Sequence, residues 1–130
     1  MGKIVKTWVY CIFLLFLCLN WVDPVAAGVL SNQKLTVSIG NEQSWTGRNG
    51  TGNLSYYGCD RSCRCTYLTG GKITCNNGTC VTKWQNKNLS YVLSSPITNN
   101  INTKEASSLT VLSNKRTVAK ERLYPKAFDN

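Results

Sequence analysis

The stretch from Cys59 to Cys80 reads CDRSCRCTYLTGGKITCNNGTC and sets the fold that we expect. Its five cysteines follow the spacing C-x3-C-x-C-x9-C-x4-C. Cys63 and Cys65 are two positions apart, so on a strand their side chains share one face and reach other strands more easily than each other. Five cysteines can form two bridges in several ways, and the sequence alone selects none of them. The disulfide candidates are therefore Cys59, Cys63, Cys65, Cys75 and Cys80.

Two turns are expected inside this stretch. Thr69-Gly70-Gly71 lies between two segments that can pair as a hairpin, residues 64–68 and 72–75, because glycine supplies the positive φ that tight hairpin turns need. Asn76-Asn77-Gly78 is a second turn signal. The cysteine stretch is thus predicted to form short antiparallel hairpins held by disulfides.

Outward from the cysteines, the preceding residues favour β structure. Leu35, Val37 and Ile39 alternate with polar residues, which is the pattern of a half-buried strand. Residues 47–58 are rich in glycine and are interpreted as a loop, whereas 81–93 could extend the sheet with poor alternation. A core of this size needs covalent staples, and clustered cysteines supply them.

The composition changes in the last part of the chain. Polar and charged residues dominate 94–130, where Leu109, Val111 and Leu112 form one small apolar cluster. We therefore expect residues 28–93 to form a small all-β, disulfide-rich module of short antiparallel hairpins, followed by a mostly disordered, flexible basic C-terminal tail over 94–130. The alternative is a terminal segment docked on the module.

The first 27 residues have the order of a secretory signal peptide. Lys3 and Lys6 are followed by an apolar run from Trp8 to Leu19, and Val25-Ala26-Ala27 offers small residues at a cleavage site before Gly28. A membrane anchor is the alternative, but a span needs roughly 20 apolar residues and this run is shorter. We expect a secreted, extracellular protein without a membrane span, whose mature chain starts at Gly28.

The residue types argue against catalysis and metal binding. The chain contains no histidine, which removes the usual general base and the commonest metal ligand. Its carboxylates are few and scattered, so no close pair suggests acid–base chemistry. Structural zinc would compete for the cysteines, but an oxidising compartment favours disulfides. The prediction is a non-enzyme without cofactor or metal.

Two kinds of surface site are predicted. Four N-x-[ST] sequons make glycosylation candidates of Asn49, Asn53, Asn77 and Asn88. The chain is basic, with 15 Lys and Arg against six Asp and Glu. Five basic residues near its end would attract polyanions: Lys115, Arg116, Lys120, Arg122 and Lys126. The alternative is that these charges only keep a tail in solution.

The C-x-C step, the glycine-containing hairpin and the C-x4-C step of residues 59–80 resemble the von Willebrand factor type C module and the pacifastin protease inhibitors. The resemblance implies a short antiparallel β module stapled by disulfides. It departs at Asp60-Arg61-Ser62, where both families usually have two residues, and an upstream cysteine of the pacifastin pattern is missing. The C-x3-C-x-C step is also similar to knottin-like inhibitors and tick chemokine-binding evasins, without their full cysteine sets.

Three functions follow as alternatives. The first is a non-catalytic extracellular binding or interaction module, whose partner is an extracellular protein or a sulfated glycan and not a nucleic acid. The second is a pacifastin-like serine protease inhibitor, although the sequon at Asn77 occupies the loop that would enter a protease. The third is a cationic defence or effector protein.

The odd cysteine count would also allow a covalent dimer. Six aromatic residues either serve recognition or form the core: Trp45, Tyr56, Tyr57, Tyr67, Trp84 and Tyr91.

Overall fold

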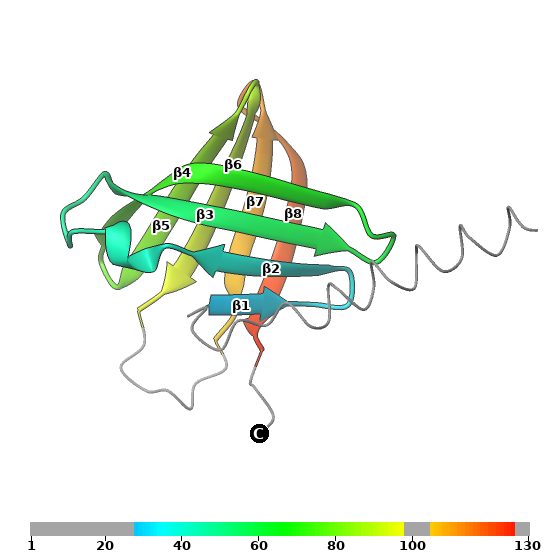
Figure 1. Cartoon of the computed structure of the whole chain (residues 1–130), viewed down its shortest axis with the longest axis horizontal. Helices are drawn as coiled ribbons and strands as arrows, with labels where there is room; N and C mark the ends of the chain where they lie inside the picture. Colours follow the sequence, from blue (N-terminus) through cyan, green and yellow to red (C-terminus); the bar gives the residue numbers. More distant parts are fainter. Residues whose placement is uncertain (1–27, 98–104, 127–130) are drawn as a thin grey trace, which may run out of the picture.

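The computed structural model describes residues 28–97 and 105–126, which form a closed barrel of eight antiparallel strands (Figure 1). Each strand pairs with its neighbour in sequence, and β1 pairs with β8. The predicted all-β, disulfide-bonded class is confirmed. The strands are β1 (Gly28–Ser31), β2 (Leu35–Gly40), β3 (Thr51–Asp60), β4 (Cys65–Asn76), β5 (Thr79–Asn86), β6 (Leu89–Pro96), β7 (Ser107–Ser113) and β8 (Arg116–Pro125).

The remaining regular element is a short 3-10 helix, η1 (Glu42–Ser44), which lies between β2 and β3. None of the helical structure in the described part of the chain is long and apolar enough to cross a membrane. The predicted signal peptide, residues 1–27, lies outside the described residues.

The hydrophobic core fills the middle of the barrel because alternate residues of each strand point inward. Trp84 is only 1% exposed, and its Nε1–H donates a hydrogen bond of 3.0 Å to the Leu54 carbonyl oxygen. Burying one such apolar side chain contributes about 1.5–3 kcal/mol. The buried apolar residues are Val37, Ile39, Leu54, Tyr56, Leu68, Trp84, Leu93, Leu109 and Leu123.

Tight two-residue turns join several of the strands. The predicted turn at Asn76-Asn77-Gly78 is confirmed, since Asn77 and Gly78 have φ of 52° and 79° and connect β4 to β5. Asn114 and Lys115, with φ of 48° and 66°, connect β7 to β8 in the same way. Positive φ at both central residues is the geometry that matches the twist of paired strands.

The turn predicted at Thr69-Gly70-Gly71 is wrong, because β4 runs straight through it. The pairing of β3 with β4 shifts register here, which makes the segment a bulge. Gly71 lies so close to the Trp84 indole that no β-carbon would fit. The glycine-rich segment 47–58 is likewise mostly strand β3, and in it the Tyr56 ring covers Gly58. In these two strands, glycine therefore marks places where an aromatic ring approaches the backbone closely, as well as places where the strand bends.

The expected disordered tail is not what residues 105–126 form. They supply β7 and β8, and β6 crosses the expected module boundary at residue 93. A barrel wall needs an apolar residue only at every second position, so Leu109 and Leu123 are buried while their neighbours remain polar. This low apolar content resembles that of a disordered segment when the sequence is considered alone. Residues 98–104 and 127–130 lie outside the described part.

The contact between β1 and β8 is the shortest of the barrel. Two residue pairs join these strands, Leu30 with Pro125 and Ser31 with Tyr124. The Asn32 side chain reinforces the contact, since its Nδ2–H donates to the Glu121 Oε2 at 2.9 Å and to the Arg122 carbonyl oxygen at 3.1 Å.

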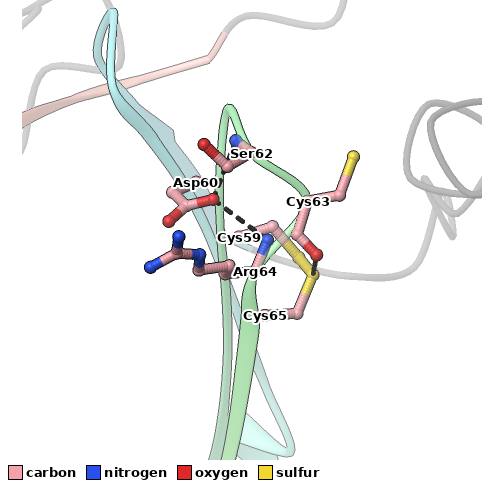
Figure 2. Close-up of a disulfide and its surroundings, with 6 residues drawn as sticks. All are labelled: Cys59, Asp60, Ser62, Cys63, Arg64 and Cys65. Carbon is pink, nitrogen blue, oxygen red and sulfur yellow. Dashed lines mark hydrogen bonds between the residues drawn. A yellow bond between two sulfur atoms is a disulfide. The ribbon is translucent and has the colours of Figure 1, made fainter. Parts of the chain in front are cut away.

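Two disulfides staple neighbouring strands, Cys59–Cys65 across β3 and β4 and Cys75–Cys80 across β4 and β5. Each closes a segment of only five or six residues, so each contributes roughly 2 kcal/mol. Figure 2 shows the first bridge beside its turn, where Asp60 Oδ1 accepts hydrogen bonds from the backbone N–H groups of Ser62 and Arg64.

Cys63, the fifth cysteine, lies in this turn with a φ of 62°, and its half-buried side chain points away from the bridge (Figure 2). The expected reach of Cys65 to a different strand is confirmed by its bridge to β3. The covalent dimer stays a prediction.

Candidate functional site

The barrel contains a cavity of about 470 Å³ at the end that carries η1, which we call the η1 end. Each of the eight strands begins or ends here, so residues from most of the barrel wall line the cavity. Its apolar lining consists mainly of Leu30, Ile39, Trp45, Leu54, Ile73 and Leu93. A hollow of this size and character suits a small, mostly apolar molecule.

A few polar side chains lie among the apolar ones in this cavity. Thr82 and Ser107 are buried, with exposed fractions of 8% and 4%. Ser95 Oγ and Ser107 Oγ share a hydrogen bond of 2.8 Å in which either hydroxyl can be the donor. These hydroxyls can accept from, or donate to, a polar group of a bound molecule, which would fix its orientation.

Two charged residues, Glu42 and Lys126, also line the cavity. Glu42 forms no ion pair with any described residue. Its partial burial raises the pKa of the carboxyl above the usual value, because desolvation disfavours the charged form. Glu42 Oε1 lies 3.2 Å from the position that a β-carbon on Gly28 would occupy, so the carboxylate rests against the first residue of β1.

The loop that holds Glu42 and Trp45 at the cavity is built from local hydrogen bonds. Asn41 adopts a φ of 58°, and its Nδ2–H donates to the Asn53 carbonyl oxygen at 2.7 Å. Ser44 Oγ donates to the Asn41 carbonyl oxygen at 2.6 Å and accepts from the Asn53 N–H at 2.8 Å. The loop is therefore fixed to β3 rather than hanging over the opening.

A second cavity of about 210 Å³ lies at the opposite end, beyond the core. Its lining includes Tyr91, Val111 and Ala119, together with Asp60, Arg64 and Glu121. Tyr56 stands beside it and contacts Trp84 and Tyr91, with ring centroids 5.3 and 5.4 Å apart. The smaller volume and the bonded Glu121 leave less room for a ligand here than at the η1 end.

The aromatic residues divide between core and surface. Tyr56 and Trp84 are buried, and Trp45 and Tyr91 pack against the core. Tyr57 and Tyr67 form an outer pair with centroids 6.4 Å apart, and they are 37% and 65% exposed.

The candidate glycosylation residues Asn49, Asn53, Asn77 and Asn88 are all exposed. Asn49 additionally accepts a hydrogen bond of 2.9 Å from the Cys75 N–H through its Oδ1. Asn77 is one of the two central residues of the tight turn between β4 and β5.

The predicted polyanion-binding residues lie along one strand rather than in a compact patch. Lys120 and Arg122 belong to β8, Lys115 and Arg116 stand at its beginning, and Lys126 follows its last residue. All five are exposed.

Sequence reasoning did not single out the cavity. In the sequence, Glu42 is one of a few scattered carboxylates and Trp45 is one of six aromatic residues. No local pattern marks either of them as a neighbour of Ser107. The nearest signal is Asn41, a residue type that tolerates positive φ and so favours a tight loop. Among the described residues, no three His, Cys, Asp or Glu side chains gather as a metal site.

Comparisons with known proteins gave no match: no family model, no curated protein and no solved structure matches the chain. The resemblance to von Willebrand factor type C and pacifastin modules therefore stays a prediction from cysteine spacing.

Proposed function

We propose that this chain is a secreted, non-catalytic extracellular binding protein that holds one small, mostly apolar molecule in the cavity at the η1 end. The observation that carries the proposal is the cavity of about 470 Å³, with apolar walls and a few buried hydroxyls. Closed eight-stranded barrels have an interior wide enough for one small ligand where side chains do not fill it. Here the core fills the middle and leaves the η1 end hollow.

The chemistry of the cavity supports binding rather than catalysis. Glu42 is the one carboxylate that lines it, and the chain has no histidine to act with it. The hydroxyls of Ser95 and Ser107 hydrogen-bond to each other, and no basic side chain of the described residues hydrogen-bonds to either of them.

The shape of the β4–β5 turn argues against the inhibitor alternative. A substrate-like inhibitor presents an extended loop to the protease, whereas Asn77 and Gly78 are the two central residues of a closed turn. The Asn76–Thr79 pair and the Cys75–Cys80 bridge hold the strands together right up to this turn.

Two observations support export. The bridges need an oxidising compartment. The four exposed sequons fit the same route.

The test is titration of the secreted protein with N-phenyl-1-naphthylamine, a neutral apolar fluorophore. We expect one saturable site, with fluorescence enhancement on binding. Ile73→Trp places a bulky ring in the cavity at the η1 end and should abolish binding. The matched control Val111→Trp fills the smaller cavity at the other end and should leave binding intact.

Near-UV circular dichroism of both variants checks that the barrel is retained. Binding that survives Ile73→Trp in a folded protein would refute the proposal, and so would equal loss in the two variants.

A further inference from the structure

Strand β8 separates its charges between the two faces of the barrel wall. Lys120 and Arg122 are exposed, and they alternate with Glu121 and the buried Leu123, which face inward. The Glu121 carboxylate accepts a hydrogen bond from the Asn32 side chain, and this bond holds it on the inner side of the wall. The outer face of β8 consequently presents cations without the acidic residue of the same strand.

The strands beside β8 add no negative charge to this face. Lys120 pairs with Thr110 and Arg122 pairs with Ser108 on β7, and both partners are uncharged hydroxyl residues. On the other side, β1 reaches only as far as Ser31, opposite Tyr124. Apart from the inward Glu121, the nearest described acidic residue in sequence is Glu105, which precedes β7 and is carried toward the Lys126 end, because Ser107 pairs with Leu123.

Two cations, Lys120 and Arg122, share the outer face of β8. A strand rises about 3.3 Å per residue, so Lys120 and Arg122 stand about 7 Å apart on the outer face of β8. The register shift between Val111 and Leu112 turns Arg116 to the other face, and Lys126 lines the cavity at the η1 end. The tight turn at Asn114 and Lys115 fixes one end of β8, and the hydrogen bond of 2.9 Å from the Lys126 N–H to the Val29 carbonyl oxygen fixes the other.

We propose that the outer face of β8 is a binding site for a linear sulfated glycan, which lies along the strand. Neighbouring sulfates of such a chain match the two cations Lys120 and Arg122 on the rigid strand, and the hydroxyls of Ser108 and Thr110 can bond to the sugar. Extracellular matrix and cell surfaces supply such chains to an exported protein. The site is on the outside of the wall, so it is independent of the proposed cavity ligand.

The experiment is calorimetric titration of secreted, glycosylated protein with a heparin octasaccharide. We expect the double variant Lys120→Gln, Arg122→Gln to weaken binding at least roughly tenfold, since a hydrogen bond to a charged group is worth about one power of ten in affinity. The control Lys72→Gln, Lys83→Gln removes the same charge from exposed, paired residues of β4 and β5, and should change affinity less than about twofold.

Three results would overturn the proposal. Equal weakening by both double variants would mean that net charge alone is responsible. Equal affinity for an unsulfated hyaluronan octasaccharide would exclude sulfate recognition. Tighter binding of duplex DNA or of phosphatidylserine vesicles at the same salt concentration would assign the face to another partner. Retained binding of N-phenyl-1-naphthylamine by the β8 variant separates this test from that of the cavity.

Discussion

Tyr56 occupies the centre of the barrel, where its ring touches Trp84 and Tyr91 and its hydroxyl lies over Gly58. Only 2% of the residue is exposed, and the hydroxyl makes no hydrogen bond to any described residue. Burial, with a further contribution from Tyr91, raises the pKa of Tyr56 to about 12. The folded state therefore favours the neutral phenol, and this contribution to stability is complete below about pH 10 and is lost as the pH rises through about 12.

We accordingly expect the wild-type protein to lose about 2 kcal/mol more than Tyr56→Phe in its free energy of unfolding between about pH 9 and pH 12. At neutral pH the wild-type protein and Tyr56→Phe should have similar free energies of unfolding, because the phenol has no hydrogen bond to lose. Urea unfolding at a series of pH values makes the comparison. Parallel pH profiles for the two proteins would contradict the assignment of this alkaline loss to Tyr56.

At the scale of elements, the seam between β1 and β8 decides whether the sheet is closed. Both disulfides lie within hairpins, so neither joins the first strand to the last. The seam instead depends on two residue pairs and on Asn32, whose Oδ1 also accepts from the N–H groups of Lys34 and Leu35. One side chain thus shapes the β1–β2 turn and ties it to β8.

Asn32→Ala should lower the free energy of unfolding by about 1–3 kcal/mol and loosen the seam, because four hydrogen bonds lose their partner. Hydrogen–deuterium exchange should speed up in β1 and β8 while β4 to β6 remain protected. Gln33→Ala, at an exposed position of the same turn, is the control and should leave exchange unchanged. Uniform acceleration over all strands would show that Asn32 supports the whole barrel rather than its seam.

Elements were predictable from the sequence only where the signal is local. The alternation of Leu35, Val37 and Ile39 and the Asn77-Gly78 turn are local, and both were predicted. The course of β4 through Gly71 depends on the distant Trp84, so the sequence favoured a turn instead. Strands β7 and β8 bury few residues of their own and become stable only within the closed wall. The cavity likewise results from the curvature of the complete barrel, which no single segment encodes.

At the scale of the whole molecule, the candidate sites are distributed over the two ends and the outer wall of the barrel. Asn49 and Asn77 belong to connections at the η1 end, whereas Asn88 lies in the β5–β6 turn at the opposite end. The β8 cations Lys120 and Arg122 lie between the ends, on the outer wall. The exposed sequon residues Asn49 and Asn77 therefore share the η1 end with the larger cavity, whereas Asn88 lies away from it.

Maturation would also change the charge of the cavity mouth. The predicted cleavage before Gly28 would convert a neutral peptide nitrogen into an ammonium group on the residue against which Glu42 rests. The protease would thereby install a counter-charge for a carboxylate that otherwise has none among the described residues.

A chain that begins at Gly28 should melt roughly 2–4 °C above one that retains Ala27, measured by calorimetry near neutral pH. The gain should fade above about pH 8, where the amino group loses its proton, and it should vanish in Glu42→Gln. Equal melting temperatures of the two chains would show that the new terminus and Glu42 do not meet. If they do meet, cleavage before Gly28 would add one positive charge at the mouth of the cavity, beside Glu42.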